Sequence, residues 1–250
     1  MQQNLYRGIY LCLGYPSQEK SLAVLAILRD HPGVDFIELG LPFSDPVADG
    51  PVISAAAQSA LANAKAQGLS PRQMLDQALD VLRGNDKKVY LMTYGNIVSH
   101  LLRQYGDKTF NRLPINGLII PDVPLREQNF FRQRGLEHSV IPFATPETTD
   151  QDLKLLAQEP VKSAPFVYFV AIRGITGSKM DFRNPELRKQ YAKVSQAVKE
   201  NHQPVVLGFG IQGRTQIQQL AEFANGFVIG TAAVELQGEP AGYRNFLDSL

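Results

Sequence analysis

Short apolar segments alternate with longer amphipathic ones along the whole chain. The short segments are rich in Val, Ile, Leu, Tyr and Phe, and most are apolar at every position, as in strands buried on both faces. They predict eight strands, at residues 6–13, 34–39, 88–93, 117–120, 139–143, 166–172, 204–209 and 226–229. The segments between them repeat apolar residues at helical spacing and predict helices at 17–31, 53–65, 70–84, 97–105, 126–135, 149–158 and 186–201, within 210–224, and from the last strand towards Leu250.

This alternation predicts an α/β protein. Eight strand–helix units in 250 residues match a (β/α)8 TIM barrel, with residues 1–250 forming a single domain. A doubly wound open sheet is the alternative, because strand order is not readable from the pattern. Three predicted helices begin with capping residues, namely Ser17, Ser70 and either Thr149 or Asp150.

Charge and cysteine content narrow the function classes. The chain has 25 Lys and Arg against 24 Asp and Glu, which gives no electrostatic case for binding nucleic acid or an anionic membrane. The single cysteine, Cys12, excludes an internal disulfide and a cysteine-built metal site. No apolar run approaches the roughly 20 residues of a membrane helix, and the N-terminus lacks a signal-peptide pattern, so we expect a soluble cytoplasmic protein.

The segment from residue 37 to residue 50 is the strongest candidate for chemistry. Glu38 interrupts an apolar strand, and Asp49 lies in the loop that follows. A single Glu at a strand end is also explained by simple exposure to solvent. The loop, however, is constrained by Pro42, Pro46 and Pro51, each of which fixes a backbone torsion. We therefore interpret the acidic loop, residues 40–50, as one that holds a carboxylate in position.

The ends of strands seven and eight suggest a phosphate site. Barrels of this kind bind phosphate through the loops after these two strands, where glycines let backbone N–H groups approach the oxygens. Here the sequence has Gly208-Phe209-Gly210-Ile211 and Gly230-Thr231. Ordinary turn glycines are the alternative. A further Gly-rich segment, residues 174–177, suggests a lid over the site.

The chain shows no pattern of a metal or covalent site. None of the histidines, His31, His100, His138 and His202, has metal-ligand spacing with another. We see no strand lysine suited to a Schiff base.

Residues 37–50 resemble, position for position, a motif of the tryptophan synthase alpha chain family. The resemblance continues in the same order at residues 14–16, 93–96, 117–124, 174–177, 208–211 and 230–231. It implies a TIM-barrel lyase of L-tryptophan biosynthesis that cleaves indole-3-glycerol phosphate to indole and glyceraldehyde 3-phosphate by a retro-aldol reaction. By this resemblance Glu38 is the general acid/base, and Asp49 pairs with the indole N–H.

The resemblance also implies the residues that contact the substrate. Tyr168, Ile53 and Tyr94 match substrate-site positions, and Thr176 matches a lid residue that orients Asp49. The implied phosphate pocket consists of Gly174, Gly208, Phe209, Gly210, Gly230 and Thr231.

A partner is implied in the same way. Family members act with a β chain that carries pyridoxal phosphate, in an α2β2 tetramer, and Pro42, Asp45 and Pro46 match the loop that touches it. This chain itself then needs no cofactor and no metal.

Some segments depart from the family pattern. The segment before the first strand is shortened, Tyr15 stands where Asp is usual, and Arg173 directly precedes Gly174. These departures keep two alternatives open: a catalytically weakened alpha subunit that mainly activates the β subunit, and another phosphosugar barrel enzyme.

Overall fold

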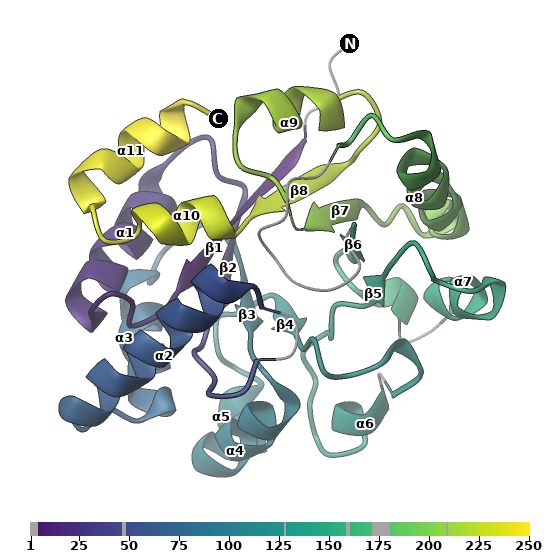
Figure 1. Cartoon of the computed structure of the whole chain (residues 1–250). Helices are drawn as coiled ribbons and strands as arrows, with labels where there is room; N and C mark the ends of the chain where they lie inside the picture. Colours follow the sequence, from purple (N-terminus) through teal and green to yellow (C-terminus); the bar gives the residue numbers. More distant parts are fainter. Residues whose placement is uncertain (1–4, 47–48, 128, 159–160, 172–180, 209) are drawn as a thin grey trace.

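Eight parallel strands form the centre of the molecule, and helices surround them (Figure 1). The computed structural model describes residues 5–46, 49–127, 129–158, 161–171, 181–208 and 210–250. The strands are β1 (Tyr6–Cys12), β2 (Phe36–Gly40), β3 (Lys88–Met92), β4 (Gly117–Ile119), β5 (Phe143–Ala144), β6 (Val167–Val170), β7 (Val205–Gly208) and β8 (Gly226–Ile229).

The strand order shows a closed barrel. It runs β4-β3-β2-β1-β8-β7-β6-β5, so the first and last strands are neighbours. The remaining gap is closed by a parallel bridge between Leu118 of β4 and Val140. There the Leu118 N–H donates to the Ser139 carbonyl at 2.9 Å, and the Ile141 N–H donates to the Leu118 carbonyl at 2.8 Å. The TIM-barrel prediction is confirmed, and the open doubly wound sheet is wrong.

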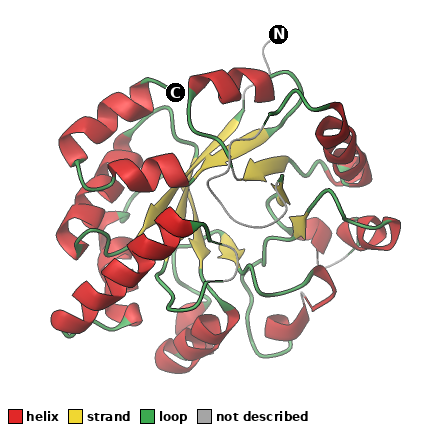
Figure 2. Ribbon diagram, in the orientation of Figure 1, coloured by secondary structure: helices red, strands yellow, loops and turns green. Residues whose placement is uncertain are grey.

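The helices cover the outside of the barrel (Figure 2). They are α1 (Gln18–Asp30), α2 (Pro51–Ala66), α3 (Pro71–Val81), α4 (Gly95–Tyr105), α5 (Asp107–Phe110), α6 (Asn129–Arg132), α7 (Asp150–Leu156), α8 (Pro185–Ala197), α9 (Arg214–Leu220), α10 (Thr231–Leu236) and α11 (Pro240–Asp248). Short 3-10 turns occupy Leu125–Glu127, Val161–Ser163 and Lys199–Asn201. The predicted caps are confirmed, because the side chains of Ser17, Ser70 and Thr149 each accept a backbone N–H at the start of α1, α3 and α7.

Three elements differ from the prediction for local reasons. The last helix is two helices, α10 and α11, because Pro240 has no N–H to continue the first one. The strand expected at 139–143 pairs regularly only at Phe143–Ala144, after Pro142 has removed a ladder donor. The helix expected at 126–135 is reduced to a 3-10 turn and α6, of which only Phe131 is buried.

Side chains fill the barrel at its amino-terminal end. The rings of Tyr6, Phe36, Tyr90 and Phe166 contact one another there, with Phe36 and Tyr6 stacked at 4.5 Å between centroids. A second apolar layer, which includes Leu39, lies between the strands and the helices. This aromatic plug leaves the carboxyl ends of the strands for a site.

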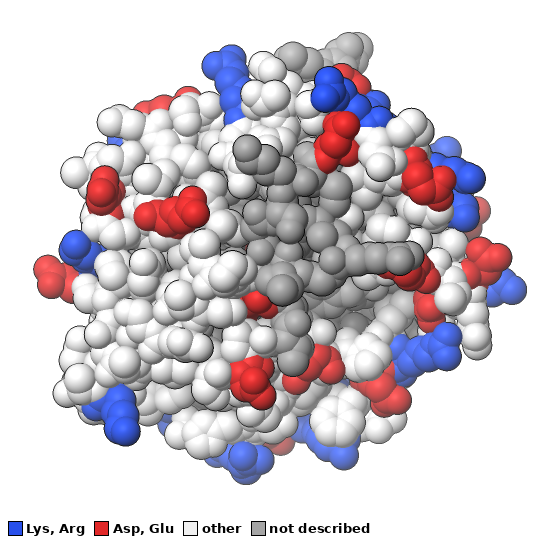
Figure 3. All heavy atoms as spheres, viewed as in Figure 1, with Lys and Arg blue, Asp and Glu red and all other residues white. Residues whose placement is uncertain are grey.

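One face of the molecule carries charges of both signs. On the face seen in Figure 3, the described Lys and Arg side chains are dispersed among Asp and Glu around the rim. Within the described ranges, no helix has the length and hydropathy to span a bilayer.

Candidate active site

Glu38 is an acid inside the barrel. It lies on the same face of β2 as Phe36, which belongs to the interior cluster, whereas Ile37 and Leu39 face the helices. Only 2% of Glu38 is exposed. The alternative of simple exposure to solvent is therefore wrong, because the strand turns this side chain towards the barrel axis.

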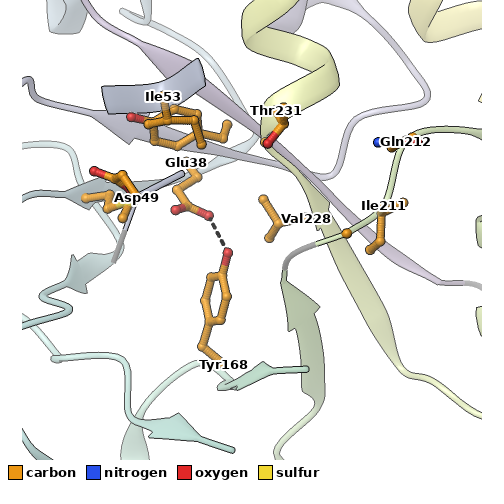
Figure 4. A pocket seen from close by; sticks show the side chains of 12 residues that line it. Glu38, Asp49, Ile53, Tyr168, Ile211, Gln212, Val228 and Thr231 are labelled. Atoms are coloured by element: carbon orange, nitrogen blue, oxygen red, sulfur yellow. Dashed lines mark hydrogen bonds between the residues drawn. The ribbon is translucent and has the colours of Figure 1, made fainter. Parts of the chain in front are cut away.

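Tyr168 is the hydrogen-bond partner of Glu38. Its hydroxyl donates to Glu38 Oε2 at 3.3 Å from β6, on the far side of the barrel (Figure 4). Gly208 makes room for this ring, since a Cβ at Gly208 would lie 2.0 Å from Tyr168 Cε1. Gly208 thus packs against Tyr168 and does not line the cavity itself, and its phosphate-pocket role stays a prediction.

Burial controls the ionisation of Glu38. Loss of hydration raises the pKa of this carboxyl to about 8, and the negative charge of Asp49 also favours its neutral form. The hydrogen bond from Tyr168 lowers the pKa and only partly offsets burial. At neutral pH the group therefore holds a proton that it can give up, which suits a general acid.

This raised pKa predicts a pH-dependent cost in stability. The folded protein binds the Glu38 proton more tightly than the unfolded chain, so stability from this group is full below pH 4.5 and is lost as pH rises through about 8. Replacement by neutral Gln removes the loss. We compare the free energy of unfolding of Glu38→Gln with that of the wild type at each pH. We expect this difference to shift in favour of the variant by on the order of 5 kcal/mol between pH 4 and pH 9. Urea unfolding of both proteins across this range measures it, and parallel pH dependences would contradict the buried, neutral state.

Asp49 lies near Glu38 at the end of the acidic loop. The Tyr94 hydroxyl donates to Asp49 Oδ2 at 3.3 Å, and the Tyr94 ring stacks on Phe43 at 4.6 Å between centroids. Partial burial raises the pKa of the Asp49 carboxyl, and the bond from Tyr94 lowers it. Tyr94 therefore holds Asp49 and does not itself line the cavity, so its contact with substrate stays a prediction.

One cavity joins these groups, with about 500 Å³ of empty space when the part open to solvent is included. Figure 4 shows Asp49 on one side of Glu38 and Val228, Thr231 and Ile211 on the other. The residues that line it are Tyr10, Glu38, Asp49, Ile53, Met92, Tyr168, Gly210, Ile211, Gln212, Val228, Gly230 and Thr231. Acids, an apolar middle and a glycine-rich wall thus share one space.

Seven of the predicted site residues line this cavity together. They are Glu38, Asp49, Ile53, Tyr168, Gly210, Gly230 and Thr231. The predictions for Gly174, Thr176 and Phe209 lie outside the described residues.

Five lining residues were not among the predicted ones: Ile211 and Gln212 after β7, and three for which the strand pattern contained a signal. Tyr10, Met92 and Val228 occupy inward positions of β1, β3 and β8, alternating with residues that face the helices. Every second residue of a barrel strand faces the interior, and this rule could have identified Tyr10. Tyr10 pairs directly with Glu38 in the β1–β2 register.

The loop expected to touch a partner continues from the cavity to the surface. Pro42 is buried, Pro46 is half-buried and Asp45 is exposed. The loop thus presents an acid to solvent close to the chain segment that carries Asp49.

The site contains acids and hydroxyls without a metal-ligand cluster. Among the residues that the structure describes, no group of three or more His, Cys, Asp or Glu side chains is placed to hold a metal ion. Cys12 is buried, and loss of hydration raises the pKa of its thiol to about 12, so it does not supply a thiolate.

Comparisons with known proteins agree on one family. A family model described as tryptophan synthase alpha chain matches residues 8–246. A tryptophan synthase alpha chain of Thermotoga petrophila is 32% identical over 92% of this chain and 89% of its own length. The corresponding protein of Bacteroides fragilis is 35% identical over 93% of this chain and 85% of its own length.

Solved structures give the same result. A Mycobacterium tuberculosis tryptophan synthase structure has a TM-score of 0.77 and 29% identity, covering 100% of this chain and 92% of the other. A structure of the tryptophan synthase α2β2 complex from Pyrococcus furiosus has a TM-score of 0.79 and 26% identity, covering 100% and 99%.

Proposed function

The chain belongs to the tryptophan synthase alpha chain family, and from that premise we propose how its site cleaves indole-3-glycerol phosphate. The chain is the lyase subunit of tryptophan biosynthesis. The other phosphosugar barrel enzymes are set aside by this membership. The observation that carries the mechanism is the pair of acids in one cavity, with Glu38 buried and kept protonated and Asp49 closer to the mouth.

Glu38 is the proton-transfer group in this proposal. It gives its proton to C3 of the indole ring, which makes the ring an electron-poor iminium. The bond from C3 to the hydroxyl-bearing carbon then breaks, its electron pair returns to the ring, and that carbon becomes the aldehyde. The Glu38 carboxylate accepts the released hydroxyl proton, so protons balance and the acid is restored.

Asp49 stabilises the charge that develops during this step. An ionised carboxylate that accepts the indole N–H favours the iminium over the neutral ring. The two acids have different surroundings, since Tyr168 donates to the deeper one and Tyr94 to the outer one. This difference supports opposite protonation states in a single cavity.

The substrate spans the cavity from the acids to the glycine-rich wall. Ile53, Met92 and Val228 supply apolar surface for the indole ring. Gly210, Gly230 and the Thr231 hydroxyl supply room and hydrogen-bonding groups for the phosphate. We assign Gly174, Phe209 and Thr176 to the same end and to the lid on the resemblance alone.

The assembly is proposed from the relatives. The Pyrococcus furiosus neighbour is an α2β2 complex, and this chain would join a β chain in the same way through Pro42, Asp45 and Pro46. Pyridoxal phosphate would reside in that β chain, and this chain would work without a cofactor of its own.

Turnover of indole-3-glycerol phosphate tests the function. We expect the purified chain to release indole and glyceraldehyde 3-phosphate slowly by itself and faster when a β chain is added. Heat-treated β chain is the control. No indole release in either condition, with the β chain still stimulated, would instead favour a subunit that mainly activates its partner.

A further inference from the structure

Gln237 is a buried polar residue whose bonds the chemistry above does not explain. It follows α10 and is 0% exposed. Its Oε1 accepts the Cys12 N–H at 3.0 Å, and its Nε2 donates to the carbonyls of Cys12, at 2.6 Å, and Tyr15. Both amide hydrogens and the carbonyl oxygen are therefore used on one short piece of main chain.

That piece of main chain is the end of β1 that β8 leaves unpaired. The Tyr6 N–H donates to the carbonyl of Asn225, just before β8, so Tyr6 and every second residue after it direct their backbone groups to that side. The β1–β8 register ends at Ile9 and Ile229, and the chain then turns into α10. Cys12 still points the same way, and the Gln237 amide takes the place of the missing strand.

Through the turn at residues 14–16, Gln237 is also connected to α2, which forms the other wall of the cavity. The turn at residues 14–16 is bonded to α2, because Asn63 Nδ2 donates to the Pro16 carbonyl. Helix α2 begins at Pro51, two residues after Asp49, and carries Ile53, and a Cβ at Gly230 would lie 3.5 Å from Ile53 Cδ1. Helix α10 packs against both α2 and β1 (Figure 1).

We propose that Gln237 is a positioning residue that fixes the Gly230–Thr231 wall of the cavity relative to the strands and loop that carry the two acids. α10 is only six residues long, so a bond at its far end controls the placement of its first residue. The inference rests on the proposed function, in which this wall receives the phosphate. Loss of the three Gln237 hydrogen bonds should weaken phosphate binding more than it slows the bond-breaking step.

Gln237→Met tests this in the full chain. It keeps the length of an unbranched side chain and removes all three hydrogen bonds. We expect KM for indole-3-glycerol phosphate and the Kd of glycerol 3-phosphate, measured by calorimetry, each to rise about tenfold, with kcat within about threefold of wild type. Asn63→Ala, at a half-buried position, removes the hydrogen bond from α2 to the Pro16 carbonyl and should raise the Kd of glycerol 3-phosphate about threefold.

Gln203→Met is the matched control. Gln203 is also buried and donates through Nε2 to two carbonyls, those of Val161 and Ala164, but it precedes β7 at the opposite end of the barrel. It should lower the melting temperature and leave the Kd of glycerol 3-phosphate unchanged. An equal rise in this control, or wild-type Kd values in both Gln237→Met and Asn63→Ala, would overturn the positioning role. A wild-type chain that neither binds glycerol 3-phosphate nor cleaves the substrate would refute the proposed function itself, and this inference with it.

Discussion

Glu38→Gln should reduce kcat for cleavage of indole-3-glycerol phosphate by about a thousandfold or more, with the fold intact. The amide fills the same space between the strands and can still meet the Tyr168 hydroxyl, but it has no proton to give to C3. KM should change little, because the lost interaction is made in the transition state. Steady-state release of indole, read against circular dichroism of both proteins, measures the effect.

Two comparisons make this result specific to proton transfer. Glu19→Gln changes an exposed acid at the start of α1 and should leave kcat at the wild-type value. The wild-type kcat/KM should fall tenfold per pH unit above about 8, where Glu38 loses its proton, whereas the residual rate of Glu38→Gln should not. Turnover close to wild type in Glu38→Gln would rule out this mechanism.

Asp49→Asn should lower kcat by about a hundredfold to a thousandfold. The substitution is nearly isosteric and keeps an acceptor for the Tyr94 hydroxyl, so the loop retains its anchor. It removes the negative charge that stabilises the iminium. It also removes a charge that raises the pKa of Glu38, so the alkaline limb of the rate profile should move to lower pH.

Asp45→Asn is the control on the same loop. Asp45 is exposed, and the isolated chain should cleave at the wild-type rate after its replacement. Tyr94→Phe should have an intermediate effect, because Asp49 keeps its charge but loses one hydrogen bond. A rate for Asp49→Asn within threefold of wild type would show that charge at this position contributes nothing to cleavage.

The architecture was predictable because local signals agreed with one another. Turn residues, capping side chains and short apolar segments all pointed to the same strand–helix units, and the caps at Ser17, Ser70 and Thr149 lie where they were expected. The order of the strands was not in those signals. It is fixed by hydrogen bonds between distant segments, such as the one that joins Leu118 to Ser139.

The candidate site was predictable at the strand ends and less so behind them. Glu38 and Asp49 were visible as acids that an apolar strand and a proline-rich loop would not carry without cause. The bond from Tyr94 to Asp49 and the space that Gly208 leaves for Tyr168 depend on which residues meet across the barrel. No pattern along the chain records such meetings, and the same is true of Gln237 and Cys12.

The ring cluster of Tyr6, Phe36, Tyr90 and Phe166 determines at which end of the barrel substrate enters and products leave. It fills the amino-terminal end of the barrel, so among the described residues the cavity opens at the carboxyl ends of the strands. Substrate and both products then pass through the same opening. The acidic loop that carries Asp49 lies at this same end, so in the proposed assembly a β chain on that loop would lie beside the opening through which indole leaves.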